Sequence, residues 1–297
     1  MRSDRALKVH AIYAVLDDVP LFAASVASIY PYVSGITVIT SHDRDWMGRD
    51  RDPSPLVGTI LSRELDPDRK IELIVANETN EARTRNRAMD FAAPRPASIR
   101  VRRQSDHDRD LVPPDYFLII DADEIYEGAA FERLMAYVAR SRRPLYRVAC
   151  VRYFKRWNYR IDGLEWTIAF VRADQRLRHL RLRRRSLPRR AAARVPGLPA
   201  SVTSRLRGFV DIPPDVGVFH HGSYVGPRAR IEDKLRSFGH HDQIAPRWLS
   251  DVYDPWTPES SDFNPMRPEL FPRAEYVDVS ALPPEIGQRD WPVDYFD

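Results

Sequence analysis

The chain has 297 residues, of which 43% are hydrophobic and 30% charged, and its formal net charge is +4. These proportions indicate a soluble globular protein, and no apolar run is long enough for a membrane-spanning helix. The single cysteine, Cys150, excludes an internal disulfide and a multi-cysteine zinc site. The first residues lack the apolar region of a signal peptide. We therefore expect a cytoplasmic protein, able to lie peripherally at the inner membrane surface.

The first half of the chain predicts an alternation of strands and helices. Short apolar or β-branched runs predict strands at Lys8–Leu16, Ile36–Thr40, Ile71–Ala76 and Tyr116–Ile120. Apolar residues at helical spacing predict helices at Leu21–Tyr32, Glu78–Ala93 and Phe131–Arg140. This order predicts an α/β fold with a mostly parallel, doubly wound sheet covered by helices. Ligands of such sheets bind outside the carboxyl ends of the strands. Asp17, Asp43 and Asp121 each lie at such a strand end.

The pattern changes after about residue 145. We predict antiparallel strands at Leu145–Phe154 and Trp166–Arg172, a strand at Val216–Val225 and a helix at Arg228–His241. The chain is divided accordingly into a domain of residues 1–250, with a nucleotide-binding half (1–145) and an acceptor half (146–250), and a Pro- and aromatic-rich arm of residues 251–297. The arm lacks periodicity and is expected to wrap the domain irregularly or to be partly disordered.

The most informative segment is DYFLIIDADEIYE, residues 115–127, in which an apolar strand delivers Asp121 and Asp123 into a polar loop. Strand residues two apart project to the same side. Two carboxylates aimed at one point repel each other unless a cation lies between them, and a hard divalent ion suits oxygen ligands. Such an ion can bridge the diphosphate of a nucleotide-sugar. The alternative is a strand-end turn that is simply rich in Asp.

This order of motifs resembles the GT-A glycosyltransferases, in particular the bacterial family-2-like group. In that group a helix with an Arg-Asn-x-Ala pattern precedes the DxD strand, and here EARTRNRA spans residues 81–88. The resemblance implies that Arg85 faces the diphosphate or base and Asn86 the sugar side, and Glu81 is named with them as a candidate for the nucleotide site. Glu81 is also one helical turn from Arg85, so the two side chains can pair on the helix surface. It also implies that Asp17 and Asp43 contact the base or ribose. The alternative is a solvated helix face.

A late histidine followed by a lysine-bearing helix is also similar to the family pattern. His221 lies three residues before Tyr224, and Lys234 follows in the next predicted helix. The resemblance implies His221 as a third metal ligand beside Asp121 and Asp123, for Mn²⁺ or Mg²⁺, and an imidazole favours Mn²⁺. Lys234 would neutralise phosphate as a point charge. An ordinary histidine and a histidine-based zinc site are the alternatives.

The catalytic base has no family signature, because neither an ED pair nor a QxxRW motif is evident. An inverting transferase needs a carboxylate or histidine that takes the proton of the acceptor hydroxyl. Glu165 is preferred, since it follows a glycine turn and precedes Trp166, which can form a sugar-stacking platform. Glu124 and Asp162 are the other candidates. If none of them serves, a retaining mechanism is favoured.

The sequence thus predicts a metal-dependent glycosyltransferase that moves a sugar from a nucleoside-diphosphate donor, with UDP favoured, to an acceptor hydroxyl in glycan, glycolipid or other conjugate synthesis. The basic segment Arg176–Arg190 suggests an anionic acceptor, namely a lipid-linked glycan, a polysaccharide or DNA, unless it is a solvated surface. Two further hypotheses stay open. One is a glycosyltransferase acting on a hydroxylated base in DNA; the other is a nucleotidyltransferase, although the expected Gly-rich loop is lacking.

Overall fold

The computed structural model describes residues 6–16, 18–41, 44–45, 48–76, 81–93, 113–177, 209–237 and 241–296. Asp17, Asp43 and residues 178–190 of the basic segment therefore lie outside the described residues, and the predictions made for them stay predictions. Within the described ranges, no helix combines the length and the apolar character needed to cross a membrane.

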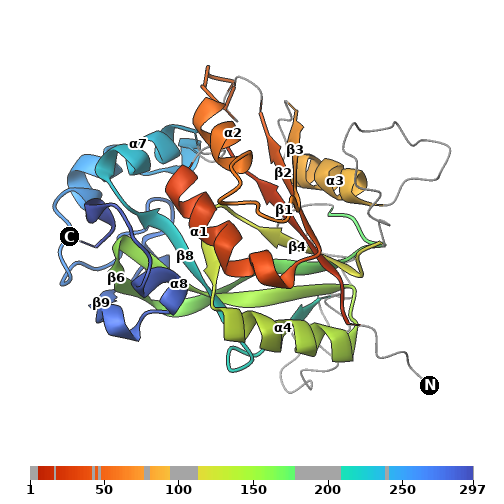
Figure 1. Cartoon of the computed structure of the whole chain (residues 1–297). Coiled ribbons are helices and arrows are strands. Elements are labelled where there is room, and N and C mark those ends of the chain that lie inside the picture. Colours follow the sequence, from red (N-terminus) through yellow and green to blue (C-terminus); the bar gives the residue numbers. More distant parts are fainter. Residues whose placement is uncertain are drawn as a thin grey trace, which may run out of the picture.

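In the described part of the chain, nine strands form one sheet in the order β3-β2-β1-β4-β6-β8-β5, and β7 and β9 pair with β6 (Figure 1). The first four strands run parallel to one another. They are β1 (Val9–Ala14), β2 (Gly35–Thr40), β3 (Ile71–Val75) and β4 (Tyr116–Ile120). The predicted fold class, an α/β protein with a mostly parallel sheet flanked by helices, is confirmed.

Helices cover both faces of this parallel half because its strands are apolar on both sides. On β1, Ala11 and Tyr13 pack in the same cluster as residues of α1 (Val19–Ile29) and α4 (Gly128–Ser141). Ile12, which points the other way, packs with Ala88 and Met89 of α3 (Glu81–Ala92). In Figure 1, α1 and α4 lie on the side of the sheet facing the viewer. Every residue of β2 and β4 is buried, as expected for strands covered on both faces.

The second half of the sheet is built on β6 (Leu145–Arg172), which joins the two predicted antiparallel strands into one extended segment. Fully extended, its 28 residues would span about 90 Å. Yet the backbone N–H of Arg172 donates to the oxygen of Pro144, so β6 folds back on itself. Its returning end pairs antiparallel with β4, and its outgoing part pairs parallel with β8 (Val218–Val225). The short strands are β5 (Glu124–Tyr126), β7 (Val210–Asp211) and β9 (Ala274–Tyr276).

The predicted helix Arg228–His241 is shorter in the structure, where α7 covers Arg228–Ser237 and a 3-10 turn, η3, covers His241–Gln243. The helix α2 (Ser54–Ile60) and the short strands β5, β7 and β9 were not predicted. A 3-10 turn, η1 (Tyr30–Tyr32), extends α1.

The C-terminal arm has little regular secondary structure. It contains a π-helical turn and short helices, namely η4 (Leu249–Tyr253), η5 (Pro268–Leu270), η6 (Val279–Ala281), α8 (Pro284–Gly287) and η7 (Val293–Tyr295). Its buried aromatic residues pack around Phe154 of β6 and Tyr224 of β8. The arm therefore completes the core over the second half of the sheet.

Candidate functional site

Asp121 and Asp123 belong to a tight turn between β4 and β5. The N–H of Glu124 donates to the oxygen of Asp121 at 3.2 Å, and the N–H of Asp121 donates to Oε2 of Glu124 at 3.1 Å. The hydroxyl of Ser25 on α1 donates to the main-chain oxygen of Glu124 at 2.5 Å, which connects the turn to α1. Because this segment is not an extended strand, the expectation that strand alternation aims both carboxylates at one point is wrong. They instead meet different partners.

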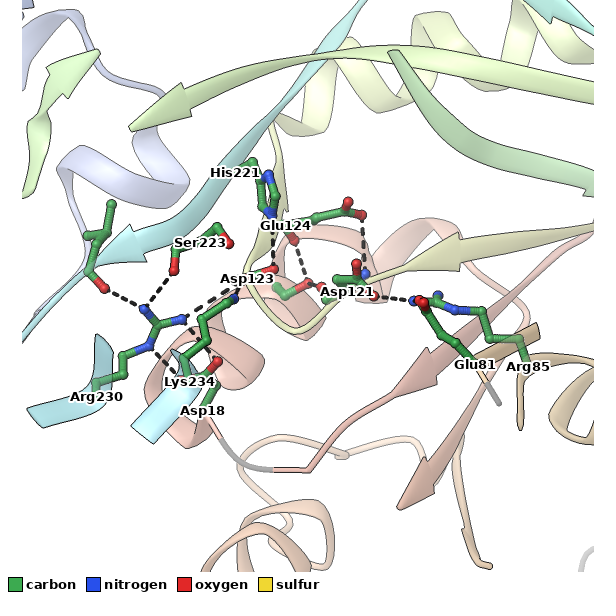
Figure 2. Close-up of polar contacts among 12 residues, drawn as sticks. Asp18, Glu81, Arg85, Asp121, Asp123, Glu124, His221, Ser223, Arg230 and Lys234 are labelled. Atoms are coloured by element: carbon green, nitrogen blue, oxygen red, sulfur yellow. Dashed lines mark hydrogen bonds and ion pairs between the residues drawn. The ribbon is translucent and has the colours of Figure 1, made fainter. Parts of the chain in front are cut away.

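Asp123 lies at the centre of a buried charge cluster (Figure 2). Its side chain is 6% exposed, and its Oδ2 is 2.5 Å from Nζ of Lys234 on α7. Its Oδ1 is 3.3 Å from Nε2 of His221 on β8, and its Oδ2 is also 3.8 Å from Nη2 of Arg230. Burial alone would raise the pKa of Asp123, but Lys234, His221 and Arg230 hold that pKa well below its usual value. The carboxylate is therefore ionised, and the neighbouring cationic side chains already compensate its negative charge.

The two consecutive histidines differ in their surroundings. His221 faces Asp123, which raises the pKa of its imidazole against the effect of burial. His220 points to the opposite face of β8, where its Nδ1 is 2.8 Å from the hydroxyl of Tyr153. Burial lowers the pKa of His220 to about 4. The structure thus brings His221, the histidine preferred from the sequence, to the acidic turn.

Asp121 is 44% exposed and pairs with Arg85 of α3, which is 3% exposed. Arg85 also pairs with Glu81 at 2.9 Å, as the helical spacing predicted. The Nε and Nη1 atoms of Arg85 are buried and form no hydrogen bond with any described residue. Arg85 therefore brings a charge and unused N–H donors to the edge of the sheet where Asp121 lies.

Glu124, the first residue of β5, is buried directly behind the turn. Burial, followed by the charge of Asp121, raises its pKa to about 8. At neutral pH its carboxyl group is thus mostly protonated and is a poor proton acceptor.

Arg230 of α7 is a functional candidate that the sequence analysis missed. Its guanidinium forms two hydrogen bonds with Asp18, at 2.5 and 2.9 Å, and donates to the main-chain oxygens of Ser223 and Val225. Asp18 ends the loop after β1 with a φ of 70°, a conformation that non-glycine residues seldom adopt. The one sequence signal was spacing, because Arg230 and Lys234 are one helical turn apart and share a face.

The remaining predicted residues lie in other contacts. The amide of Asn86 donates to the oxygen of Leu177 at 2.6 Å and accepts from its N–H at 2.8 Å, so a ligand would have to displace these bonds. Glu165 pairs with Arg152 at 3.5 Å, and the main-chain oxygen of Asp162 accepts from Arg152 at 3.3 Å. Neither carboxylate contacts the Asp123 cluster within the described residues.

The residues predicted as metal ligands have donor atoms suitable for a cation, but these atoms do not converge on one point in this structure. Two carboxylates and an imidazole nitrogen are donors that Mn²⁺ accepts. Yet no group of three or more His, Cys, Asp or Glu side chains in the described ranges is arranged to hold a metal ion. Lys234 occupies one oxygen of Asp123, so a cation could use that oxygen only after Lys234 moves.

Comparison with known proteins does not assign a family. No protein-family model and no curated protein matches the chain. Among solved structures, S. aureus TarS 1-349 is similar, with a TM-score of 0.37 and 9% sequence identity. The likeness covers 77% of this chain and 64% of that chain, which is less than two thirds of it. At this TM-score the likeness carries no argument about function, which must be argued from the site.

Proposed function

We propose that this chain is a glycosyltransferase whose nucleoside-diphosphate-sugar donor binds at the turn formed by Asp121 and Asp123. The observation that carries this proposal is that one turn at the carboxyl end of β4 gathers a buried arginine from α3 and a lysine from α7. A diphosphate needs charged donors of this kind, and an arginine fork matches its oxygens. Ligands of doubly wound sheets bind at this edge.

Arg85 and Lys234 would bind the diphosphate from two sides. Arg85 supplies unused N–H donors at Nε and Nη1. Lys234 supplies an ammonium group, now paired with Asp123. A uridine nucleotide is favoured from the sequence resemblance, and Asp17 and Asp43 remain the residues proposed for the base or ribose.

Asp121, Asp123 and His221 would hold Mn²⁺ or Mg²⁺. When bound, such an ion would offset the negative charge that develops on the departing nucleoside diphosphate. Lys234 now pairs with Asp123, so that pair would have to open before Asp123 could serve as a ligand. The ammonium group of Lys234 would then be available to the diphosphate.

Glu165 is the proposed base that receives the proton of the acceptor hydroxyl in an inverting transfer. Its carboxylate is about half exposed and pairs with Arg152 at 3.5 Å. Glu124 is less suitable because its raised pKa keeps it protonated. Asp162 is exposed, also belongs to β6 and is the second candidate.

The acceptor is proposed to be anionic and to bind through the basic segment Arg176–Arg190, in which Arg176 pairs with Asp90 at 2.6 Å.

The donor site is tested by titrating UDP and UDP-glucose into the protein in the presence of Mn²⁺, by calorimetry. We expect Arg85→Met to weaken UDP binding by about 10- to 100-fold, because hydrogen bonds to charged groups contribute about 1.5–3 kcal/mol. The matched control is Arg140→Met, which removes an exposed arginine of α4 and should leave the affinity unchanged. Equal UDP affinity in Arg85→Met and wild type would contradict the proposed diphosphate site.

A further inference from the structure

Arg152 on β6 is a buried arginine with most of its hydrogen-bonding capacity unused. Its side chain is 8% exposed. Its Nη2 donates one long hydrogen bond, of 3.3 Å, to the main-chain oxygen of Asp162. Its Nε and Nη1 are buried and form no hydrogen bond with the residues that the structure describes. A guanidinium has five N–H donors, and a buried donor left without an acceptor carries a free-energy cost. An acceptor group supplied by a ligand would remove this cost.

The sheet places Arg152 beside the candidate donor site. Arg152 pairs with His221 of β8, and His221 pairs in turn with Glu124 of β5. Paired residues project from the same face of a sheet, and adjacent strands lie about 4.8 Å apart. Arg152 is therefore one strand away from His221, whose Nε2 is 3.3 Å from Asp123. This is close enough for one substrate to span both places.

The contacts of Arg152 define the direction from which a ligand can approach. The ring of Phe271, in the C-terminal arm, lies with its centroid 5.1 Å from Cζ of Arg152. A guanidinium that stacks on a ring keeps its N–H edge free, and that fork matches the two oxygens of a carboxylate or phosphate. Thr167, two residues after Glu165, also buries a hydroxyl that bonds to no described residue. By strand alternation Thr167 shares the face of Glu165.

Among the described residues, Glu165 is the acid that pairs with Arg152, and the two side chains are not in close contact. The separation is 3.5 Å, and the carboxylate of Glu165 is about half exposed. Exposed ion pairs contribute little, and water can take over the solvation of Glu165. Glu165 pairs only with Nη1 of Arg152, at a distance too long for a good hydrogen bond, so Nε and the N–H groups of Nη1 can still donate to a second anionic group.

We propose that Arg152 binds an oxyanion, a carboxylate or phosphate group, carried by the acceptor beside the hydroxyl that receives the sugar. The acceptor role rests on the proposed glycosyltransferase function, whereas the binding of an oxyanion does not. The site would select acidic sugars or sugar phosphates over neutral ones. Arg152 would then hold the acceptor hydroxyl near Glu165.

Two small oxyanions test this site by calorimetry with the whole chain: D-glucuronate for a carboxylate and glycerol 3-phosphate for a phosphate, with D-glucose as the neutral comparison. We expect wild type to bind at least one oxyanion and not glucose, and Arg152→Met to bind it at least about 10-fold more weakly, as loss of a charged hydrogen-bond pair implies. The oxyanion that binds more tightly identifies the acceptor group. Arg160→Met is the matched control, since it removes an exposed arginine of β6 that pairs with Glu275, and it should bind as wild type does.

A second variant, Glu165→Gln, keeps the test decisive if Arg152→Met fails to fold. Removing the competing negative charge should tighten oxyanion binding, whereas a site that does not exist would give no change. Wild type that binds neither oxyanion, or an unchanged affinity in Glu165→Gln, would overturn the proposal. UDP affinity is measured on the same samples: loss of UDP binding with intact oxyanion binding would contradict the donor site alone.

Discussion

Asp123 and Glu124 are adjacent in the chain, but their surroundings shift their pKa values in opposite directions. Both carboxyl groups are buried. Around Asp123 the charges of Lys234, His221 and Arg230 outweigh burial and lower its pKa. Around Glu124 burial and Asp121 raise the pKa to about 8. Two acids with pKa values driven apart are typical of sites that separate a charged role from a neutral one.

His10 on β1 provides a pH-dependent prediction outside the site. Its Nε2 is 2.8 Å from the hydroxyl oxygen of Thr37, and burial lowers its pKa to about 4. The unfolded chain binds this proton at its ordinary pKa of about 6.5. Between these values the unfolded state holds more protons, so stability falls as the pH decreases from about 6.5 to about 4.

The expected loss from His10 is at most about 3 kcal/mol, because each pKa unit corresponds to about 1.4 kcal/mol. Urea unfolding near pH 7 and near pH 4.5 measures it. The variant His10→Asn should lose less stability on acidification than wild type, and comparing the two removes the contributions of other groups such as His220. Identical losses in the two proteins would show that His10 is not the titrating group.

At the residue scale, chemistry was more predictable than geometry. The DxD pair, His221 and Lys234 could be selected from the sequence, and the structure places all of them around one turn. The partner of each carboxylate could not be predicted, since the backbone between β4 and β5 directs Asp121 toward α3 and Asp123 toward α7. Arg230 was missed because its partner, Asp18, is 212 residues away in the chain.

At the scale of elements, α7 joins the ends of two strands. One face of this helix presents Arg230 to Asp18, after β1, and Lys234 to Asp123, after β4. A third ion pair, between Asp233 and Arg51, is more exposed. The helix therefore holds the two strand ends that carry the candidate site, and its position depends on buried charge pairs.

We predict that Arg230→Met destabilises the protein by about 3 kcal/mol or more, because it leaves Asp18 without its partner in a mostly buried place. Asp18→Asn in the same chain should recover part of that loss, which a double-mutant cycle by urea unfolding measures. Arg228→Met is the matched control, since this α7 arginine is half exposed in its pairs with Glu232 and Asp254 and should cost much less stability than Arg230→Met. Strictly additive effects of Arg230→Met and Asp18→Asn would contradict a stabilising interaction between Arg230 and Asp18.

The long apolar elements were predictable and the short ones were not. β1 to β4 each follow an apolar run and formed where expected. α2 contains Pro55 and Gly58, residues of low helix propensity, and forms because Leu56 and Ile60 bury one face. β5 has three residues, too few for a period, and depends on pairing with β8 about a hundred residues later. Tertiary packing decides such elements.

At the scale of the whole molecule, the C-terminal arm completes the core beside the candidate site. Phe154 of β6 is surrounded by aromatic rings of the arm, including Trp256, Phe263 and Phe271. Phe271 also stacks on Arg152. The arm has no periodic pattern, so the sequence could not specify where it packs. Its aromatic content was the only indication that it would be buried.

Phe263→Ala should destabilise the protein by about 3–5 kcal/mol, because the side chain is fully buried against Phe154. Urea unfolding measures the change. Val293→Ala, at an exposed position of the same arm, is the control and should change stability by less than about 0.5 kcal/mol. Equal effects of the two substitutions would mean that the arm does not contribute to the core.

The central claim is that the Asp121–Asp123 turn binds a nucleoside diphosphate together with a metal ion. The most direct measurement is thermal unfolding with UDP, GDP, CDP or dTDP, each with and without Mn²⁺, for wild type and Asp123→Ala. At about 100 times its Kd, a ligand adds about 2.7 kcal/mol of stability. We predict that UDP stabilises wild type only with Mn²⁺ and that Asp123→Ala abolishes the effect. A chain that no nucleotide stabilises, or one stabilised equally without Mn²⁺ or Asp123, would contradict this account.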